Sequence, residues 1–209
     1  MQRLSADAYQ GLVYNATQLE ADGHGPKVLR LADGSFLKMF RRKRLISSEA
    51  LRPYAERFAE NARALHEADI PAPKVIALYR IETPKRTAVH YIGLPGITLR
   101  QAMKEAETDE REWLVERFGQ LLAHLHEIGI YFRSLHLGNV LLLPDRRLGL
   151  IDFADMHRGR APMPMYKRRR NLKHMQRYEQ EQAWLFTDYR AALARGYRQL
   201  APLRVDGLL

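Results

Sequence analysis

The chain lacks cysteine altogether, and it has no long apolar run. The absence of cysteine excludes disulfide bonds and thiolate metal sites, and it fits a reducing compartment. A membrane-spanning helix needs about 20 apolar residues in succession, and no window approaches this length. Residues 1–8 also lack the apolar core of a signal peptide. We therefore expect a soluble, cytoplasmic protein, with peripheral attachment to a membrane as the alternative.

Acidic residues are fewer than basic ones. The 209 residues include 34 Lys and Arg and 24 Asp and Glu, for a net charge of +10. This charge favours an anionic partner such as nucleic acid, anionic lipid or a phosphorylated glycan. The imbalance is greatest in residues 158–177, where the density of cations favours anion binding over a merely solvated face. The basic residues there are Arg158, Arg160, Lys167, Arg168, Arg169, Arg170, Lys173 and Arg177, and no acid lies among them.

The first half of the chain indicates strands joined by turns. Extended structure is expected at residues 12–19, 27–31 and 35–40, because these segments favour strands and tight turns separate them. The turn between the first two contains Gly23 and Gly25. Glycine permits close backbone approach, so this turn could lie over phosphates, although most such turns only reverse the chain.

Lys38 lies within the third of these strands, between apolar neighbours. It is either an edge-strand lysine whose stem follows the sheet surface or a cation aimed at a bound anion. Ser-Ser-Glu at 47–49 offers an N-cap for a helix expected to run to about Ala68. Glu56 and Glu60 lie one helical turn apart, so either one of them pairs with Lys38 or both are solvated.

Two more strands are expected at residues 74–81 and 87–92, and Gly-Leu-Pro-Gly at 93–96 then breaks the pattern. The chain beyond this point is rich in helical periodicity. This change predicts two units, residues 1–96 and 97–209, with a hinge at 93–96.

Four helices are expected in the second half, at residues 98–106, 111–128, 171–185 and 187–200. Between the second and third lies a hairpin, in which two apolar runs flank a Pro-Asp turn. Asn139 precedes the first run and Asp152 ends the second. An amide oxygen near a carboxylate suits Mg²⁺ with a bound nucleotide, while the alternative is a buried hairpin without ligands.

The order of these features resembles the protein-kinase-like fold, and within it the bacterial lipopolysaccharide core kinases (the Kdo and heptose kinase family). The resemblance covers about residues 12–177. Ser-Leu-His-Leu-Gly-Asn at 134–139 is similar to the family's Asp-Leu-His-x-Gly-Asn, and Asp-Phe-Ala at 152–154 stands in the place of Asp-Phe-Gly. The resemblance implies an α+β fold with two lobes, a small antiparallel-sheet N-lobe and a short, mainly helical C-lobe.

The resemblance also implies a site for ATP and Mg²⁺. Lys38 would grip the α and β phosphates, Glu60 would be its helix partner with Glu56 as the fallback, and Asn139 and Asp152 would hold the metal ion.

The remaining contacts to the nucleotide are implied in the same way. Gly23 and Gly25 would cover the phosphates, although Val28 stands where the family has a third glycine. Leu94 of the hinge would contact adenine.

One departure from the family concerns catalysis, because Ser134 replaces the aspartate that takes the proton of the acceptor hydroxyl. A serine has no useful basicity at neutral pH, and loss of the base would slow the reaction by up to ~10²–10⁴-fold. His136 and Asp155 are candidates to substitute for it. The protein is accordingly expected to be an ATP-dependent phosphotransferase or, alternatively, a pseudokinase that binds nucleotide without turnover.

The expected partner is an anionic glycolipid or lipopolysaccharide core acceptor. Contact with the inner membrane would run through Lys167, Arg168, Arg169 and Arg170. A basic nucleic-acid-binding protein is the weaker alternative, since the basic run contains no recognised binding motif and no aromatic stacking pattern.

Overall fold

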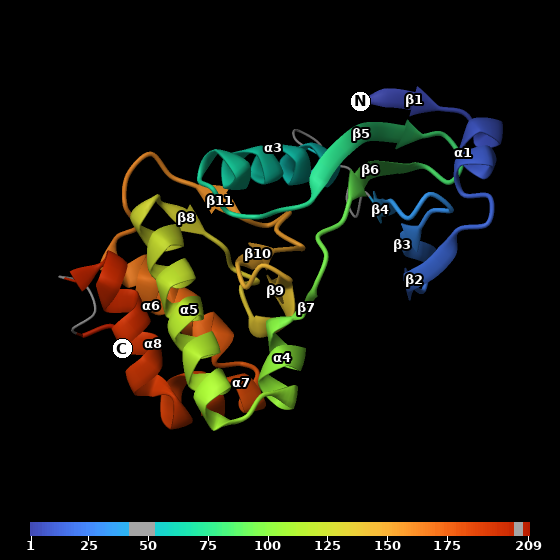
Figure 1. Cartoon of the computed structure of the whole chain (residues 1–209). Coiled ribbons are helices and arrows are strands. Elements are labelled where there is room, and N and C mark those ends of the chain that lie inside the picture. The colour runs from blue at the N-terminus through green and yellow to red at the C-terminus, as the bar shows by residue number, and fades with distance from the viewer. Residues whose placement is uncertain (42–52, 203–206) are drawn as a thin grey trace. The chain divides into compact units, whose positions relative to one another are not determined.

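The computed structural model describes residues 1–41, 53–202 and 207–209 (Figure 1). The expected N-cap at 47–49 lies outside these residues. The chain forms two compact units. The first comprises residues 1–66 and 72–94, and the second comprises residues 67–71 and 95–209.

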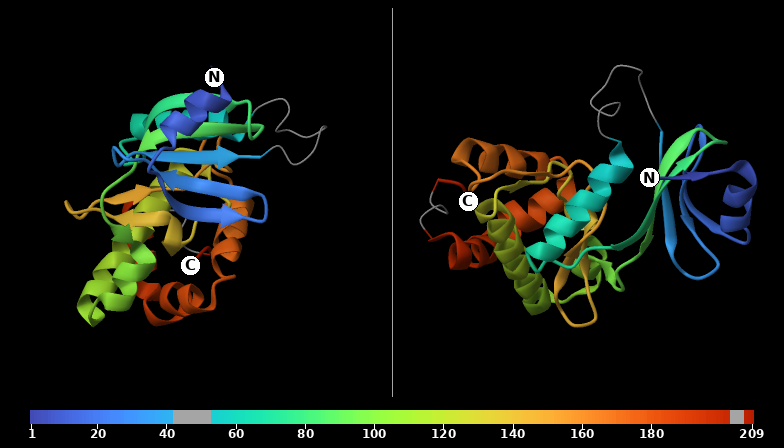
Figure 2. Two further views of the ribbon diagram at one scale, coloured as in Figure 1. Left: turned by 90° about the vertical axis from the view of Figure 1, so that its right-hand side faces the viewer. Right: turned by 90° about the horizontal axis from the view of Figure 1, so that it is seen from above.

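The first unit is built on a six-stranded sheet with the order β1-β5-β6-β4-β3-β2. Every pair of neighbours is antiparallel except β1 and β5. Figure 2 shows the N-terminal strands in blue beside the later strands in green. The elements are β1 (Gln2–Leu4), α1 (Ala6–Leu12), β2 (Thr17–Asp22), β3 (Gly25–Arg30), β4 (Phe36–Phe40), α3 (Tyr54–Glu67), β5 (Lys74–Ile81) and β6 (Arg86–Ile92).

The sheet has a core against α1, where apolar side chains from the helix and strands gather. Tyr9 of α1 packs with the buried strand residues Leu37 and Met39. The expected strand at residues 12–19 is wrong in its first half. Ser5 caps α1 by accepting a hydrogen bond from the backbone N of Ala8 at 3.2 Å, and this cap outweighs the strand propensity further along.

The second unit is mainly helical and carries two small sheets, with strand orders β10-β9-β7 and β11-β8. Its helices are α4 (Leu99–Glu105), α5 (Thr108–Glu127), α6 (Met165–Met175), α7 (Glu179–Ala183) and α8 (Arg190–Leu200), with a 3₁₀ turn at Leu137–Asn139 and a π-helical turn at Trp184–Asp188. Its strands are β7 (Ile97–Thr98), β8 (Ile130–Tyr131), β9 (Val140–Leu142), β10 (Leu148–Leu150) and β11 (His157–Arg158).

Local signals set most boundaries of the second unit. Thr98 caps α4 by accepting from the backbone N of Gln101, as the sequence predicts. The expected hairpin is confirmed, because β9 and β10 pair in antiparallel register. The expected helix at 171–185 is confirmed only in part: residues 171–175 belong to α6, which begins directly after Pro164 and ends at Met175, and the rest is divided between α7 and the π-helical turn. Proline is well suited to a helix start, since it lacks the N–H that the first turn leaves unpaired.

The sheet-rich first unit and the helical second unit confirm the expected α+β fold class. Within the described residues, no helix has both the length and the apolar character to cross a membrane.

Candidate functional site

Lys38 lies in the interior of the first unit's sheet. Its strand β4 runs between β3 and β6, and Lys38 pairs with Val28 and Val89. The alternative of an edge-strand lysine is therefore wrong. The residue is 7% exposed, and it shares its face of the sheet with Phe40, because alternate strand residues point the same way. The ring of Phe40 stacks at 5.9 Å on Tyr54 of α3, so Lys38 is on the face that α3 covers.

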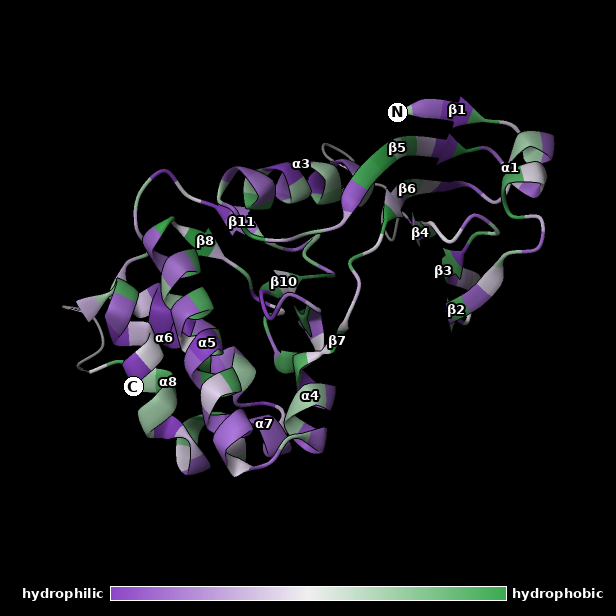
Figure 3. Cartoon of the chain, in the orientation of Figure 1, coloured by the Kyte–Doolittle hydropathy of each residue, from purple (hydrophilic) through white to green (hydrophobic). Residues whose placement is uncertain are grey.

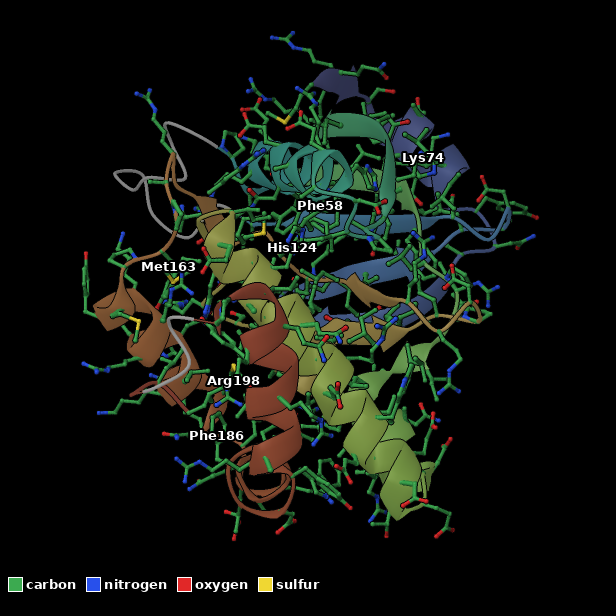
Figure 4. All side chains as sticks on the ribbon, turned by 60° about the vertical axis from the view of Figure 1, so that its left-hand side comes forward. Phe58, Lys74, His124, Met163, Phe186 and Arg198 are labelled. Atoms are coloured by element: carbon green, nitrogen blue, oxygen red, sulfur yellow. The ribbon has the colours of Figure 1, made fainter. Side chains whose placement is uncertain are left out.

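Glu56 and Glu60 lie on α3, on which Figure 4 labels Phe58. The ring of Phe58 packs on that of Tyr91, with the centroids 5.4 Å apart. Glu56 is half-buried and Glu60 is exposed. A carboxylate near Lys38 would hold its ammonium charged and directed. Which of the two glutamates takes this part stays a prediction.

The glycine-rich turn joins β2 to β3. Asp22 accepts a hydrogen bond from the backbone N of His24 at 2.9 Å, which fixes the turn and lowers the pKa of Asp22. Gly25 has a φ of 108°, a conformation that side-chain-bearing residues rarely adopt. A Cβ at Gly23 or Gly25 would meet no neighbouring atom. The turn therefore has open space beside it, and its contact with phosphates stays a prediction.

Segment 93–96 has neither helix nor strand. Half-buried Leu94 is the last residue of the first unit, and Pro95 begins the second. Gly96 has a φ of 125°, and a Cβ there would overlap the carbonyl of Leu142, so only glycine fits. The hinge and its contact with adenine stay predictions.

The loop between β8 and β9 places Ser134 against a carboxylate. The Ser134 hydroxyl donates a hydrogen bond to Asp155 Oδ2 over 2.6 Å. Asp155 Oδ1 is buried and has no hydrogen-bond partner within the described residues. The Nε of Arg133 lies 3.6 Å from Oδ2. Unlike serine, a carboxylate can accept a proton at neutral pH, so Asp155 brings to Ser134 the basicity that this position lacks.

His136 is held by hydrogen bonds at Nδ1. This atom accepts from the backbone N of Gly138 at 3.0 Å and lies 3.2 Å from Nη2 of Arg100, also a donor. Nδ1 therefore carries no proton, and the neutral ring has its proton on Nε2. Burial lowers the pKa of His136, although Glu181 opposes the effect. Nδ1 of His136 already accepts hydrogen bonds and Nε2 already carries a proton, so neither nitrogen is available to take one. The geometry therefore favours Asp155 over His136 as a proton acceptor.

Asn139 and Asp152 flank the hairpin of β9 and β10. Asn139 Nδ2 donates to the backbone O of Ser134 at 2.9 Å, which fixes the amide and leaves Oδ1 as its acceptor atom. The backbone O of Asn139 accepts from the N of Ile151 at 3.0 Å, which joins the two ends of the hairpin next to Asp152. Asp152 has a φ of 53°, in the left-handed region that aspartate tolerates better than most residues.

The chemistry of these two side chains fits Mg²⁺. Both offer hard oxygen donors, and Mg²⁺ in kinase sites is usually held by one or two side chains together with substrate phosphates and water. In the part of the chain that the structure describes, no group of three His, Cys, Asp or Glu could hold a metal by itself. The residues therefore fit a metal ion that arrives with a nucleotide better than a resident one.

Sequence reasoning missed a buried ion pair that supports the loop. Glu181 of α7 is 1% exposed and accepts from Arg100 Nε at 2.7 Å. Its other oxygen accepts from the backbone N of Leu137 at 2.9 Å. Glu181 thus positions the loop that carries Ser134 and Asn139. Its short polar helix, Glu-Gln-Glu-Gln-Ala, gives no signal of burial.

The two-unit α+β fold, with an interior lysine in the sheet and an Asn and Asp around a hairpin, defines a kinase-like phosphotransferase. The model of the phosphotransferase enzyme family (APH) matches residues 15–134, more than half of the chain. The chain therefore belongs to this family, which normally uses ATP and Mg²⁺. No curated protein matches it. The matched region includes Lys38 and ends at Ser134.

Proposed function

We propose that the protein is a kinase that phosphorylates a sugar hydroxyl of a lipopolysaccharide core or related glycolipid. Phosphotransfer is the chemistry of its family. The choice of acceptor is supported by the Ser-Leu-His-Leu-Gly-Asn and Asp-Phe-Ala sequences and by the basic surface described below.

The nucleotide side of the site is assigned to seven residues. Lys38, with Glu60 as its partner, would bind phosphates, Gly23 and Gly25 would let the turn approach them, and Leu94 would contact adenine. Asn139 and Asp152 would hold Mg²⁺, which when bound would neutralise charge on the phosphoryl oxygens.

The proposal that the protein catalyses transfer depends mainly on one observation, the 2.6 Å hydrogen bond between the Ser134 hydroxyl and Asp155. Asp155 would take the proton of the acceptor hydroxyl, and Ser134 would orient that hydroxyl through its own oxygen. Phosphoryl transfer depends mainly on positioning and charge neutralisation, so a displaced base is compatible with turnover.

The acceptor side is assigned to the basic residues of α6, with one correction. Lys167, Arg169 and Arg170 are exposed and can meet an anionic glycolipid or membrane surface. Arg168 cannot, because it is 0% exposed and bonds to the backbone O of Met163 at 2.7 Å. Figure 3 shows the largely hydrophilic composition of α6.

A pseudokinase is the second candidate, favoured by the serine at position 134. It would keep the nucleotide site without turnover. The two candidates differ only in the transfer step, so binding and turnover must be measured separately.

The test begins with the thermal shift produced by Mg-ATP. We expect stabilisation of the wild type and of Lys74→Ala, a control for an exposed lysine of the same sheet, and loss of the shift in Lys38→Ala. Transfer from labelled ATP to purified core glycolipid is then measured. Asp155→Asn should lower the rate by about 10²–10⁴-fold with little effect on Mg-ATP binding.

The possible outcomes distinguish the kinase from the pseudokinase and test the assigned base. Nucleotide binding without transfer in any variant supports the pseudokinase. Transfer that survives Asp155→Asn unchanged refutes the assigned base. Absence of both binding and transfer refutes the kinase proposal.

A further inference from the structure

A small polar cavity of about 210 Å³ opens beside Ser134 in the second unit. It lies between the loop that follows β8 and the last turn of α6 with the segment after it, so all of its walls belong to one compact unit. Its polar lining comes from Arg133, Ser134, His136, His174, Arg177 and Tyr178.

The charge in this cavity is mainly positive and poorly neutralised. Arg133 is 64% exposed at its side chain, and its ion-pair distance to Asp155 is a long 3.6 Å. Arg177 is exposed and makes no ion pair within the part of the chain that the structure describes. Asp155 also accepts the hydrogen bond of Ser134. Among the described residues, only one of the two guanidinium groups, that of Arg133, thus has a carboxylate as partner, and it shares that carboxylate with Ser134.

His174 provides an independent indication of a binding site. Its Nε2 is buried and has no hydrogen-bond partner among the described residues. Burial lowers the pKa of His174, the cations of Arg177, Arg170 and Arg133 lower it further, and only Asp155 acts in the opposite direction. A buried polar nitrogen in a positive field is stabilised when an anion enters and accepts a hydrogen bond from it.

We propose that this cavity binds a phosphate or carboxylate group carried by the acceptor, and so presents a neighbouring acceptor hydroxyl to Ser134 and Asp155. Arg133 and Arg177 supply charge, and guanidinium groups match the planar or tetrahedral oxygens of such anions. His174 supplies a further hydrogen bond. This inference rests on the proposed function and narrows it, since it makes the acceptor an acidic sugar rather than a neutral or cationic one.

The chemistry of the cavity opposes a cationic acceptor. An ammonium group in the cavity would lie among Arg133, Arg177 and His174, and like charges at close range disfavour binding. A neutral sugar would leave Nε2 of His174 and the two guanidinium groups without an anion. The side chains that line the cavity therefore select for an acidic substituent on the acceptor.

The test follows the imidazole signal of His174 by NMR in the full-length protein, assigned with His174→Gln. The probes are inorganic phosphate, glucose 6-phosphate, glucuronate and uncharged glucose. We expect the three anions to bind and to raise the pKa of His174, because a nearby anion stabilises the imidazolium, whereas glucose should do neither.

Arg177→Gln should weaken binding of the anions by about tenfold or more, since it removes a charge-assisted bond. Lys104→Gln removes the same charge from an exposed site on α4 and should leave binding unchanged. Circular dichroism and Mg-ATP binding establish that each variant is folded. If inorganic phosphate binds but neither sugar does, the cavity is a site for the free ion and the proposal fails.

Two further results would also overturn the proposal. One is displacement of the anions by Mg-ATP, which would assign the cavity to the nucleotide. The other is equal anion binding by Arg177→Gln and wild type. Intact Mg-ATP binding with no anion response refutes this acceptor site alone, whereas anion binding with no Mg-ATP binding refutes the proposed kinase function.

Discussion

His126 should make the second unit less stable at mildly acidic pH. It is 0% exposed in α5, where its Nε2 lies 3.1 Å from Asn171 Oδ1 and its Nδ1 lies 2.9 Å from the Tyr197 hydroxyl. Burial lowers the pKa of His126 from 6.5 to about 4; the bond to Asn171 opposes this, and the charge of Arg168 adds to it. The folded protein therefore keeps His126 neutral over a pH range in which an unfolded histidine is protonated.

The sign and size of the effect follow from proton linkage. Between the folded pKa of about 4 and the unfolded value of 6.5, the unfolded state binds more protons, so the free energy of unfolding falls as the pH falls. Each pKa unit is worth about 1.4 kcal/mol. His126 should therefore contribute a loss of about 2 kcal/mol between about pH 7.5 and pH 5, and about 3.4 kcal/mol once the pH is below 4.

Urea unfolding followed by tryptophan fluorescence measures this loss, because both tryptophans, Trp113 and Trp184, belong to the second unit. His126→Gln will lower stability at every pH, but its stability should fall by about 2 kcal/mol less than that of wild type between pH 7.5 and 5. The exposed His24 of the first unit gives a control variant, His24→Gln, that should follow wild type. If His126→Gln has the same pH dependence as wild type, the reasoning is refuted.

Two further predictions, one on helix packing and one on a buried ion pair, use the same unfolding assay. Gly196→Ala should destabilise the second unit by about 1–3 kcal/mol, because its Cβ would overlap the carbonyl of Glu116 where α8 meets α5. The control Gly11→Ala in α1 meets no atom and should be neutral or slightly stabilising; equal losses would contradict the packing account. Arg168→Met should cost about 2–4 kcal/mol, since it removes the 2.8 Å ion pair to Glu127, which is 29% exposed and so partly screened. A loss below about 0.5 kcal/mol, the range of an ordinary surface change, would show that this pair is not structural.

The sequence predicted those helices and strands whose boundaries are set by neighbouring residues. Alternating residues and tight turns predicted β4 to β6, and Thr98 predicted the start of α4. The errors also have local causes. Val13 and Tyr14 favour a strand, but Asn15 takes a φ of 58° and turns the chain before β2 begins. A helix cap and a turn residue together outweighed side-chain propensity there.

Contacts between distant residues could not be predicted in the same way. Arg100 and Glu181 are 81 positions apart, and each alone looks like a surface charge. The cavity beside Ser134 requires the loop at 133–136 to meet residues 174–178. Composition predicted anion binding by the basic run, which stays a proposal, and only the fold distinguishes buried Arg168 from exposed Arg177.

In the proposed kinase, the Ser134–Asp155 pair would supply the carboxylate that position 134 lacks. An aspartate at position 134 would bring a second carboxylate to within hydrogen-bonding distance of Asp155, and two such groups cannot both ionise without a large rise in one pKa. Serine avoids this repulsion and donates to Oδ2 instead. Asp155 Oδ1 stays buried without a partner among the described residues, a state that costs free energy. A hydrogen bond from the acceptor hydroxyl of the proposed reaction would lower this cost, so the proposed role of Asp155 agrees with the unpaired state of Oδ1.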